Sequence, residues 1–319
     1  MNRTDFLAAR RTGIGGSDIG AILGLNHYRT PYDVFLDKTV PDARPDTAGE
    51  AAYWGTTLET VVAREYQRRT GRKVQRVNHL LRHPEHDFAI ANIDRAIINP
   101  DISGTVRWKD GRLTTDSLLE CKTANSFTAA DWGDAGTDSV PDSYLCQCQW
   151  YLGVTGCQTA ELAVLIGGQD YRIYTIARDP ELFADMLEIA GKFWRNCRRG
   201  IPPVPSSTDE ALKHWPRHVA GKSVIVDVSI REKCDRIASI GDEIAALKAE
   251  KDALETDVMI AFGDAEEISC QGNRLATWKT QTAKRLDGKR LKEELPDIAA
   301  EYTKTTESRV LRLSKRGKK

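Results

Sequence analysis

Hydrophobic and polar residues follow two different periods in the first 200 residues, which predicts a mixture of helices and strands. Helical spacing or helix-capping residues mark the ranges 17–25, 56–70, 142–152 and 180–199, and another helix is predicted to begin near Thr30 and Pro31. Strand-like runs cover 73–81, 88–98, 117–123, 159–166 and 171–177, the last two joined by a Gly-Gly-Gln-Asp hairpin signal. This order predicts an α/β sandwich.

A change of composition at residues 200–207 predicts a domain boundary. Three prolines within residues 202–205, followed by two serines, can continue neither a helix nor a central strand. We therefore expect one domain over residues 1–203 and a C-terminal extension over 204–319.

The extension contains a heptad pattern that predicts a long helix over about residues 233–262. Its seam is formed by Ile237, Ile240, Ile244, Leu247, Lys251, Leu254, Val258 and Ala261. The helix either packs on its own chain or forms an intermolecular coiled coil, in which Lys251 would cost stability and help to fix the register. Short strands are also expected: residues 309–314 alternate like an edge strand, and residues 315–319 form a basic tail that we expect to be disordered.

Composition excludes several classes of protein. With 40% hydrophobic and 29% charged residues, the chain is neither collagen-like nor disordered throughout. Its 46 basic and 46 acidic residues balance, so a nucleic-acid interface would need locally concentrated positive charge. No apolar run reaches the roughly 20 residues of a membrane helix. The seven cysteines include no Cys-x2-Cys pair, and without a secretory signal we expect reduced thiols in a cytosol.

Acidic residues in two strand-like runs predict a metal site. Glu120 and Lys122 lie two positions apart, so their side chains share one face of the strand. Asp94 lies in the run 88–98 and would approach Glu120 if the two strands are neighbours. Two carboxylates this close repel each other unless a cation lies between them, and oxygen ligands suit Mg²⁺.

Glu59 is a third candidate acid. It lies on the predicted helix 56–70 in line with Val62, Ala63 and Tyr66, a stripe that should be buried. A carboxylate there is either a capping or boundary residue or, together with the other acids, a metal ligand, because a buried charge needs a partner.

Five sequence motifs resemble one family. They are the stretch RRTGIGGSDIGAILG from Arg10 to Gly24, Trp54-Gly-Thr-Thr-Leu-Glu59, Asn92-Ile-Asp94, Leu119-Glu-Cys-Lys122 and Gln147-Cys-Gln-Trp-Tyr151. Their order resembles that of the YqaJ-like viral recombinases, the phage lambda exonuclease group of the PD-(D/E)XK nucleases, over roughly residues 5–200. The resemblance implies a restriction-endonuclease-like core, with a central mixed sheet flanked by helices. The family's Pro-Asp-Gly is Ile93-Asp94-Arg95 here, which places a bulky cation beside the expected metal site.

The resemblance also implies roles for single residues. Asp94 and Glu120 would bind Mg²⁺, with two ions expected and Mn²⁺ able to substitute, helped by the Cys121 carbonyl. Glu59 would be an outer or second-metal ligand, and Lys122 would orient the attacking water and help to deprotonate it. The residues expected to hold a 5′-phosphate or DNA are Arg10 (or Arg11, one position on), Ser17, Gln149, Gln147, Asn92 and Arg95. For Ser17 a helix cap, and for Gln149 a buried amide bonded to backbone, remain alternatives.

By resemblance, the activity would be 5′→3′ degradation of linear double-stranded DNA, leaving a 3′ single strand for phage-type recombination. The expected partners are DNA ends, further copies of the chain in a trimeric ring and a single-strand annealing protein. An endonuclease, a single-strand nuclease or a non-catalytic DNA-binding module are the alternatives. A basic patch of Arg64, Arg68, Arg69, Arg72, Lys73 and Arg76 is either a solvated helix end or a track for the DNA backbone.

Overall fold

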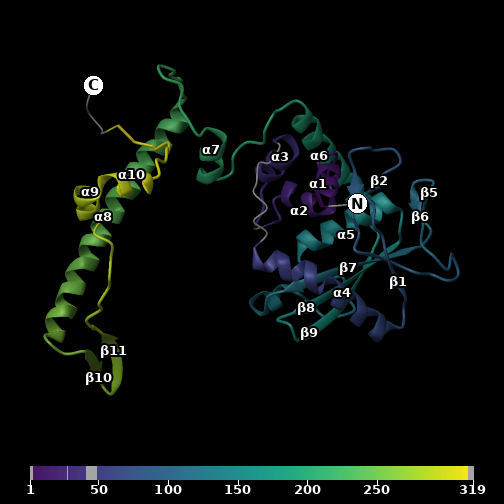
Figure 1. The fold of residues 1–319 in the computed structure, drawn as a ribbon, viewed down its shortest axis with the longest axis horizontal. Helices are drawn as coiled ribbons and strands as arrows, with labels where there is room; N and C mark the ends of the chain where they lie inside the picture. Colours follow the sequence, from purple (N-terminus) through teal and green to yellow (C-terminus); the bar gives the residue numbers. More distant parts are fainter. Residues whose placement is uncertain (1–2, 27, 41–48, 315–319) are drawn as a thin grey trace. The chain divides into compact units, whose positions relative to one another are not determined.

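A five-stranded mixed sheet lies at the centre of the N-terminal unit in the computed structural model, which describes residues 3–26, 28–40 and 49–314 (Figure 1). Its strand order is β1 (Val74–Arg76), β4 (Arg95–Ile97), β7 (Ser117–Ala124), β8 (Thr159–Ile166) and β9 (Asp170–Ala177). Only β7 and β8 pair in parallel within this sheet, because the chain between them crosses over through α5 (Asp142–Thr155). The predicted mixed α/β fold is confirmed.

Helices cover both faces of this sheet (Figure 1). On one face, α4 (Glu50–Thr70) packs its buried Val62, Ala63 and Tyr66 against Leu119 and Cys121 of β7. On the other face lies α5, against which α2 (Gly16–Ile22) and α6 (Pro180–Arg198) pack. The remaining N-terminal helices are α1 (Arg3–Arg10), α3 (Pro31–Thr39) and the short 3₁₀ helix η1 (Ser126–Asp131). Burial of apolar surface on both faces holds the layers together.

The helix ends follow the predicted local signals. The Thr30 side chain caps α3 by accepting a hydrogen bond from the Asp33 N–H, and Pro31 occupies the first turn. Gly71 ends α4 at φ +71°, a backbone conformation that favours glycine. The upstream end of α4 differs from the prediction, because the helix begins at Glu50, six residues before Thr56.

Two predicted strands are each divided in the structure. The run 88–98 forms β3 (Ile90–Ala91) and β4, with Asn92–Asp94 outside the ladder, and the run 73–81 forms β1 and the start of β2 (Leu81–Arg82). Strands β2 and β3 pair with each other, and β5 (Trp108–Lys109) forms an unpredicted hairpin with β6 (Arg112–Leu113). The break before β4 places Asp94 where its side chain can leave the plane of the sheet.

The chain divides into two units between Ser206 and Ser207. The C-terminal unit contains α7 (Thr208–His214), α8 (Val228–Phe262), β10 (Glu267–Cys270), β11 (Asn273–Thr277), α9 (Gly288–Glu294) and α10 (Pro296–Glu301). The predicted long helix is confirmed as α8. The predicted edge strand at 309–314 is wrong, because these residues pair with no strand, and the tail 315–319 lies outside the described residues. Nowhere in residues 3–26, 28–40 and 49–314 is a helix both long and apolar enough to cross a membrane.

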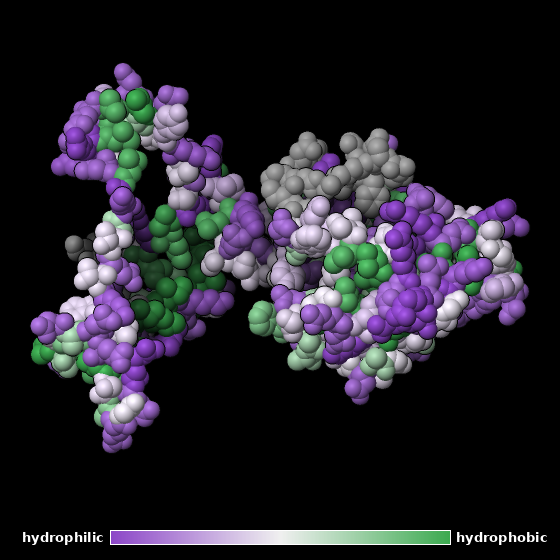
Figure 2. All heavy atoms as spheres, turned by 60° about the horizontal axis from the view of Figure 1, so that its bottom comes forward, coloured by the Kyte–Doolittle hydropathy of each residue, from purple (hydrophilic) through white to green (hydrophobic). Residues whose placement is uncertain are grey.

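The heptad seam of α8 is exposed along its length. Its large apolar side chains range from 40% exposed at Ile240 to 64% at Leu247, and Figure 2 shows hydrophobic residues gathered on the C-terminal unit. Packing on the chain itself therefore does not bury the seam in the part of the chain that the structure describes. The intermolecular coiled coil stays a prediction.

Substituting Leu247 with aspartate tests that prediction. A charge at a seam position must be buried without a partner, which costs about 3 kcal/mol and lowers the association constant about 100-fold. Sedimentation velocity of the full chain should then show dissociation of the oligomer. Ala249→Asp is the control, since Ala249 lies outside the heptad seam and is exposed; a wild-type chain that is monomeric at tens of micromolar would contradict the coiled coil.

Candidate metal and phosphate site

The side chains of β7 alternate between the two faces of the sheet. Leu119 and Cys121 belong to the apolar cluster under α4. Glu120 and Lys122 point the opposite way, toward α5, and their side chains form an ion pair of 2.7 Å. A single strand thus provides both an apolar contact surface and a charged pair.

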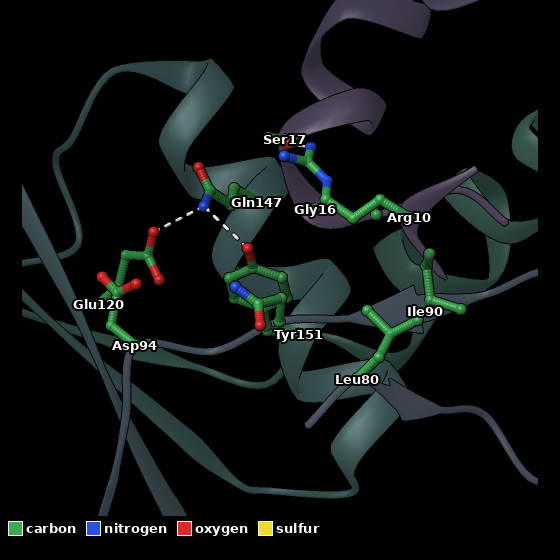
Figure 3. Close-up of a pocket in the computed structure, with 11 residues that line it drawn as sticks. Arg10, Gly16, Ser17, Leu80, Ile90, Asp94, Glu120, Gln147 and Tyr151 are labelled. Atoms are coloured by element: carbon green, nitrogen blue, oxygen red, sulfur yellow. Dashed lines mark hydrogen bonds between the residues drawn. The ribbon is translucent and has the colours of Figure 1, made fainter. Parts of the chain in front are cut away.

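Asp94 approaches Glu120 from the break between β3 and β4. The Cys121 N–H donates a hydrogen bond of 2.9 Å to Asp94 Oδ2, which fixes the Asp94 carboxylate at the edge of β7. Figure 3 shows the carboxylates of Asp94 and Glu120 next to each other, and both line a cavity of about 180 Å³.

Burial and mutual repulsion disfavour two negative charges here. Burial raises the pKa of Asp94 well above its ordinary value, and the neighbouring Glu120 adds to this rise. Burial also raises the pKa of Glu120, although the charge of Lys122 opposes it. Glu120 is 2% exposed, and its buried Oε2 has no hydrogen-bond partner among the residues that the structure describes. An unpaired buried carboxylate oxygen is costly, so this atom fits a cation ligand.

Lys122 and Gln147 lie beside Glu120, and Gln147 also lines the cavity. Lys122 donates to Glu120 Oε1 and, at 3.0 Å, to Gln147 Oε1. Burial alone would lower the pKa of Lys122, but the charges of Glu120 and Asp94 raise it. Gln147 Nε2 donates to Glu120 Oε1 at 2.6 Å and to the Tyr151 hydroxyl at 3.1 Å. In this structure Lys122 therefore acts as a hydrogen-bond donor, and its expected role in deprotonating the attacking water stays a prediction.

The same cavity contains Arg10 and Ser17. The Arg10 guanidinium donates to Ser17 Oγ at 2.7 Å, and both residues line the cavity together with Asn92 (Figure 3). Arg11 is exposed and does not line it, so the structure favours Arg10 over the alternative one position on. A guanidinium beside a hydroxyl is a suitable site for a phosphate.

A buried ion cluster beneath Arg10 was not predicted. Asp18 is fully buried, and its carboxylate forms ion pairs with Lys38 at 2.7 Å and Arg29 at 2.6 Å. Lys38, on α3, also donates to the Arg10 carbonyl at 2.8 Å, which ties the Arg10 backbone to α3. Burial would raise the pKa of Asp18, but the cations of Lys38, Arg29 and Arg10 hold it below its ordinary value.

Two further residues, Gly16 and Tyr151, also line the cavity, and neither of them was assigned a role from the sequence. Tyr151 lies one helical turn after Gln147, a spacing that could have drawn attention to its hydroxyl. Gly16 packs against the Tyr151 ring, and a Cβ there would meet ring atom Cε1 at 2.5 Å. Any side chain at position 16 would therefore move Tyr151 or close the cavity.

Gln149 does not reach the cavity. Its Nε2 donates to the Ala177 carbonyl and its Oε1 accepts from the Asp179 N–H, at 2.7 and 2.9 Å. The proposed phosphate contact of Gln149 is wrong for this arrangement, because both ends of the amide are bonded to backbone, the alternative that the sequence left open.

Glu59 was expected at the metal site and Arg95 at the DNA-binding site, but in the structure they form an ion pair with each other. Arg95 Nη1 lies 2.5 Å from Glu59 Oε1, so Arg95 faces this acid and does not line the cavity. Within the described residues, no three His, Cys, Asp or Glu side chains gather closely enough to hold a metal. In this structure Arg95 therefore holds Glu59 apart from a three-acid cluster, and the role of Glu59 as an outer or second-metal ligand stays a prediction.

The basic patch is partly neutralised. Arg68 and Arg69 both bind Glu65, and Arg72 pairs with Glu161 of β8 at 3.2 Å. Its other members, Arg64, Lys73 and Arg76, are exposed. A role of this patch in tracking DNA stays a prediction.

Comparison with known proteins places these residues in a family. The YqaJ-like viral recombinase domain model matches residues 5–158. The chain is 34% identical over 316 residues to the uncharacterized protein YqaJ of Bacillus subtilis (strain 168), covering 97% of this chain and 93% of that protein.

Two solved exonuclease structures are similar to part of this chain. An alkaline exonuclease from Laribacter hongkongensis has a TM-score of 0.48 at 20% identity, over 66% of this chain and 96% of that one. A phage-related exonuclease from Haemophilus somnus 129PT has a TM-score of 0.41 at 12% identity, over 61% and 99%. The match to the domain model, together with the near full-length relative, shows that the chain belongs to the YqaJ-like viral recombinase family.

Proposed function

We propose that this chain is a metal-dependent exonuclease that degrades linear double-stranded DNA from 5′ ends, leaving 3′ single strands for recombination. The observation that carries the proposal is a cavity lined by two carboxylates, those of the half-buried Asp94 and the buried Glu120, and by the hydrogen-bonded pair Arg10 and Ser17. A DNA end could place its 5′-phosphate on Arg10 while the adjoining linkage lies near the acids. Membership of a recombinase family agrees with this role.

The residues present fit a divalent ion. Glu120 Oε2 is buried and unpaired, Asp94 supplies a second carboxylate, and carboxylate oxygens are ligands that suit Mg²⁺. Asp94, Glu120 and the Cys121 carbonyl would hold Mg²⁺ or Mn²⁺, which would supply Lewis-acid stabilisation of the phosphate and a more acidic water.

The chain's own polar groups would orient the substrate. Lys122, held by Glu120 and Gln147, would direct its third N–H group and its positive charge toward a phosphate oxygen or the attacking water. Arg10 would fix the terminal phosphate with a two-pronged hydrogen bond, and Ser17 would add a neutral one. Holding both ends of the reacting nucleotide lowers the barrier by pre-orienting the bond to be cleaved.

We also propose a cytoplasmic, homo-oligomeric enzyme that acts with a single-strand annealing protein. The free state of all seven cysteines supports a reducing compartment. A closed trimeric ring around the duplex would explain processive digestion, because a ring cannot dissociate sideways.

End-labelled DNA tests the proposal directly. With Mg²⁺, the protein should degrade linear duplex from 5′-phosphorylated ends, leave covalently closed circles intact and lose activity in EDTA. Cleavage of circles would instead indicate an endonuclease, and degradation of single strands alone a single-strand nuclease. Binding without hydrolysis would favour the non-catalytic alternative.

Substituting Arg10 with alanine should reduce the preference for 5′-phosphorylated over 5′-hydroxyl ends about 10- to 100-fold, because a charge-assisted hydrogen bond contributes about 1.5–3 kcal/mol. The ratio of kcat/KM on the two ends is the measurement. Arg11→Ala is the matched control, one residue away and outside the cavity. An unchanged ratio in Arg10→Ala would place the phosphate site elsewhere.

A further inference from the structure

The ion pair between Arg95 and Glu59 lies on the α4 face of the sheet, opposite the side on which Glu120 and Lys122 project. Arg95 pairs in register with Leu119 of β7, whose side chain packs beneath α4. Glu59 reaches down from α4 to the guanidinium. The side chain of Arg95 is 8% exposed and that of Glu59 is 21% exposed, so this pair is largely shielded from water.

The Arg95 guanidinium is held by three partners at once. Its Nη1 donates to Glu59 Oε1 at 2.5 Å and to the Asp94 carbonyl at 2.6 Å, and its Nη2 donates to Thr60 Oγ1 at 3.4 Å. A rigid, permanently charged fork fixed in this way is not easily displaced. Its bond to the Asp94 carbonyl also places the positive charge next to the backbone of a proposed metal ligand.

Glu59 nevertheless remains close to the other acids. Its negative charge contributes to raising the pKa of both Asp94 and Glu120. Because Arg95 Nη1 bonds to both Glu59 Oε1 and the Asp94 carbonyl, these two oxygens lie near each other and could both contact a divalent ion that replaced the guanidinium. In this chain a guanidinium already balances its charge, and a divalent ion at Glu59 would have to displace a buried arginine with three hydrogen bonds.

We propose that the Arg95 guanidinium takes the place of a second divalent cation at Glu59, so that the catalytic site binds a single metal ion, at Asp94 and Glu120. This inference rests on the proposed function, because it assumes that these two acids bind a metal. Arg95 is then a positioning residue that acts through Glu59 and the Asp94 backbone.

Mn²⁺ titration followed by electron paramagnetic resonance tests the inference without reference to activity. The full-length wild-type chain should bind one Mn²⁺ in the cavity. Arg95→Ala frees Glu59 and should bind two, and Arg95→Ala/Glu59→Gln should return to one. Arg64→Ala, which removes an exposed cation from the same helix as Glu59, should leave the wild-type value of one unchanged.

Each result separates the inference from the proposed function. Two ions on the wild-type chain, or one on a folded Arg95→Ala variant, would overturn the role of Arg95 and leave the metal site at Asp94 and Glu120 intact. No Mn²⁺ on the wild-type chain would overturn both. If Arg95→Ala does not fold, the Glu59→Gln variant tests the inference. One bound Mn²⁺, with an affinity within about twofold of wild type, would support it. A loss of Mn²⁺ affinity of about tenfold or more, typical of a removed ligand partner, would contradict it.

Discussion

Replacing Glu120 with glutamine should abolish DNA hydrolysis and, in the same variant, raise the melting temperature of the N-terminal unit in EDTA. The amide has nearly the shape of the carboxyl group but no charge, so it cannot replace a metal ligand. We expect a fall in kcat of about a thousandfold or more, as when a metal-binding group is lost.

The gain in stability follows from the burial of Glu120. Its carboxylate is 2% exposed, one of its oxygens has no partner, and its pKa is raised mainly by burial. Each pKa unit above the ordinary value corresponds to about 1.4 kcal/mol by which folding disfavours the charged form at neutral pH. The uncharged amide removes this cost and the repulsion of Asp94. It also loses the attraction of Lys122, but the net shift of the Glu120 pKa is upward, so the melting temperature should rise, by about 2–4 °C for each kcal/mol of the cost.

Differential scanning fluorimetry in EDTA, and a nuclease assay in Mg²⁺, measure the two effects on one preparation. Glu188→Gln on α6 is the control, because Glu188 is exposed and far from β7 along the chain; neither property should change. If the Glu120→Gln variant keeps a tenth of the wild-type rate, Glu120 is not a catalytic residue. If its melting temperature is unchanged, burial of the Glu120 charge does not destabilise the folded state.

The site on β7 could be predicted because its determinants are local. Strand side chains alternate with a period of two, so Glu120 and Lys122 had to share a face once residues 117–123 were assigned to a strand. Helix ends at Pro31 and Gly71 were equally local, since one residue type sets the backbone at each.

Which side chains of other elements face the cavity depends on packing, and this was harder to predict from the sequence. Gln147 and Gln149 lie two residues apart on α5, about 200° around the helix, so only one can face the cavity. Sequence spacing alone left both as candidates, and the structure turns Gln147 toward Glu120 and Gln149 toward the backbone at the end of β9.

Long charged side chains were the hardest to place. The partner of Arg95 is on α4, 36 positions earlier in the chain, and one partner of Asp18 is Lys38 on another helix. No pattern of hydrophobic residues specifies such contacts. By contrast, the β5–β6 hairpin did carry a local signal: Asp110 and Gly111 have φ of 50° and 75°, the conformation for which Asp-Gly turns are typical.

The pH dependence of stability should reveal Asp94. Its folded-state pKa is raised well above 3.8, chiefly by burial and then by the charge of Glu120. Between about pH 4 and that raised pKa, the folded state therefore binds more protons at Asp94 than the unfolded state does. The free energy of unfolding of the wild-type chain, relative to Asp94→Asn, should fall as the pH rises through this window, by up to about 1.4 kcal/mol per pH unit, and level off above it.

Chemical denaturation of both proteins in EDTA from pH 4.5 to 8.5 gives this difference. Asparagine keeps an oxygen that can accept the Cys121 N–H, so the comparison isolates the carboxyl charge. The exposed Asp101→Asn should show no trend over the same range. Adding Mn²⁺ should flatten the wild-type curve, because a bound cation favours the charged carboxylate and replaces the proton. If the free energy of unfolding of the wild-type chain, relative to Asp94→Asn, instead rises with pH in EDTA, the fold itself stabilises the Asp94 anion. Electrostatic repulsion would then no longer support a cation between Asp94 and Glu120.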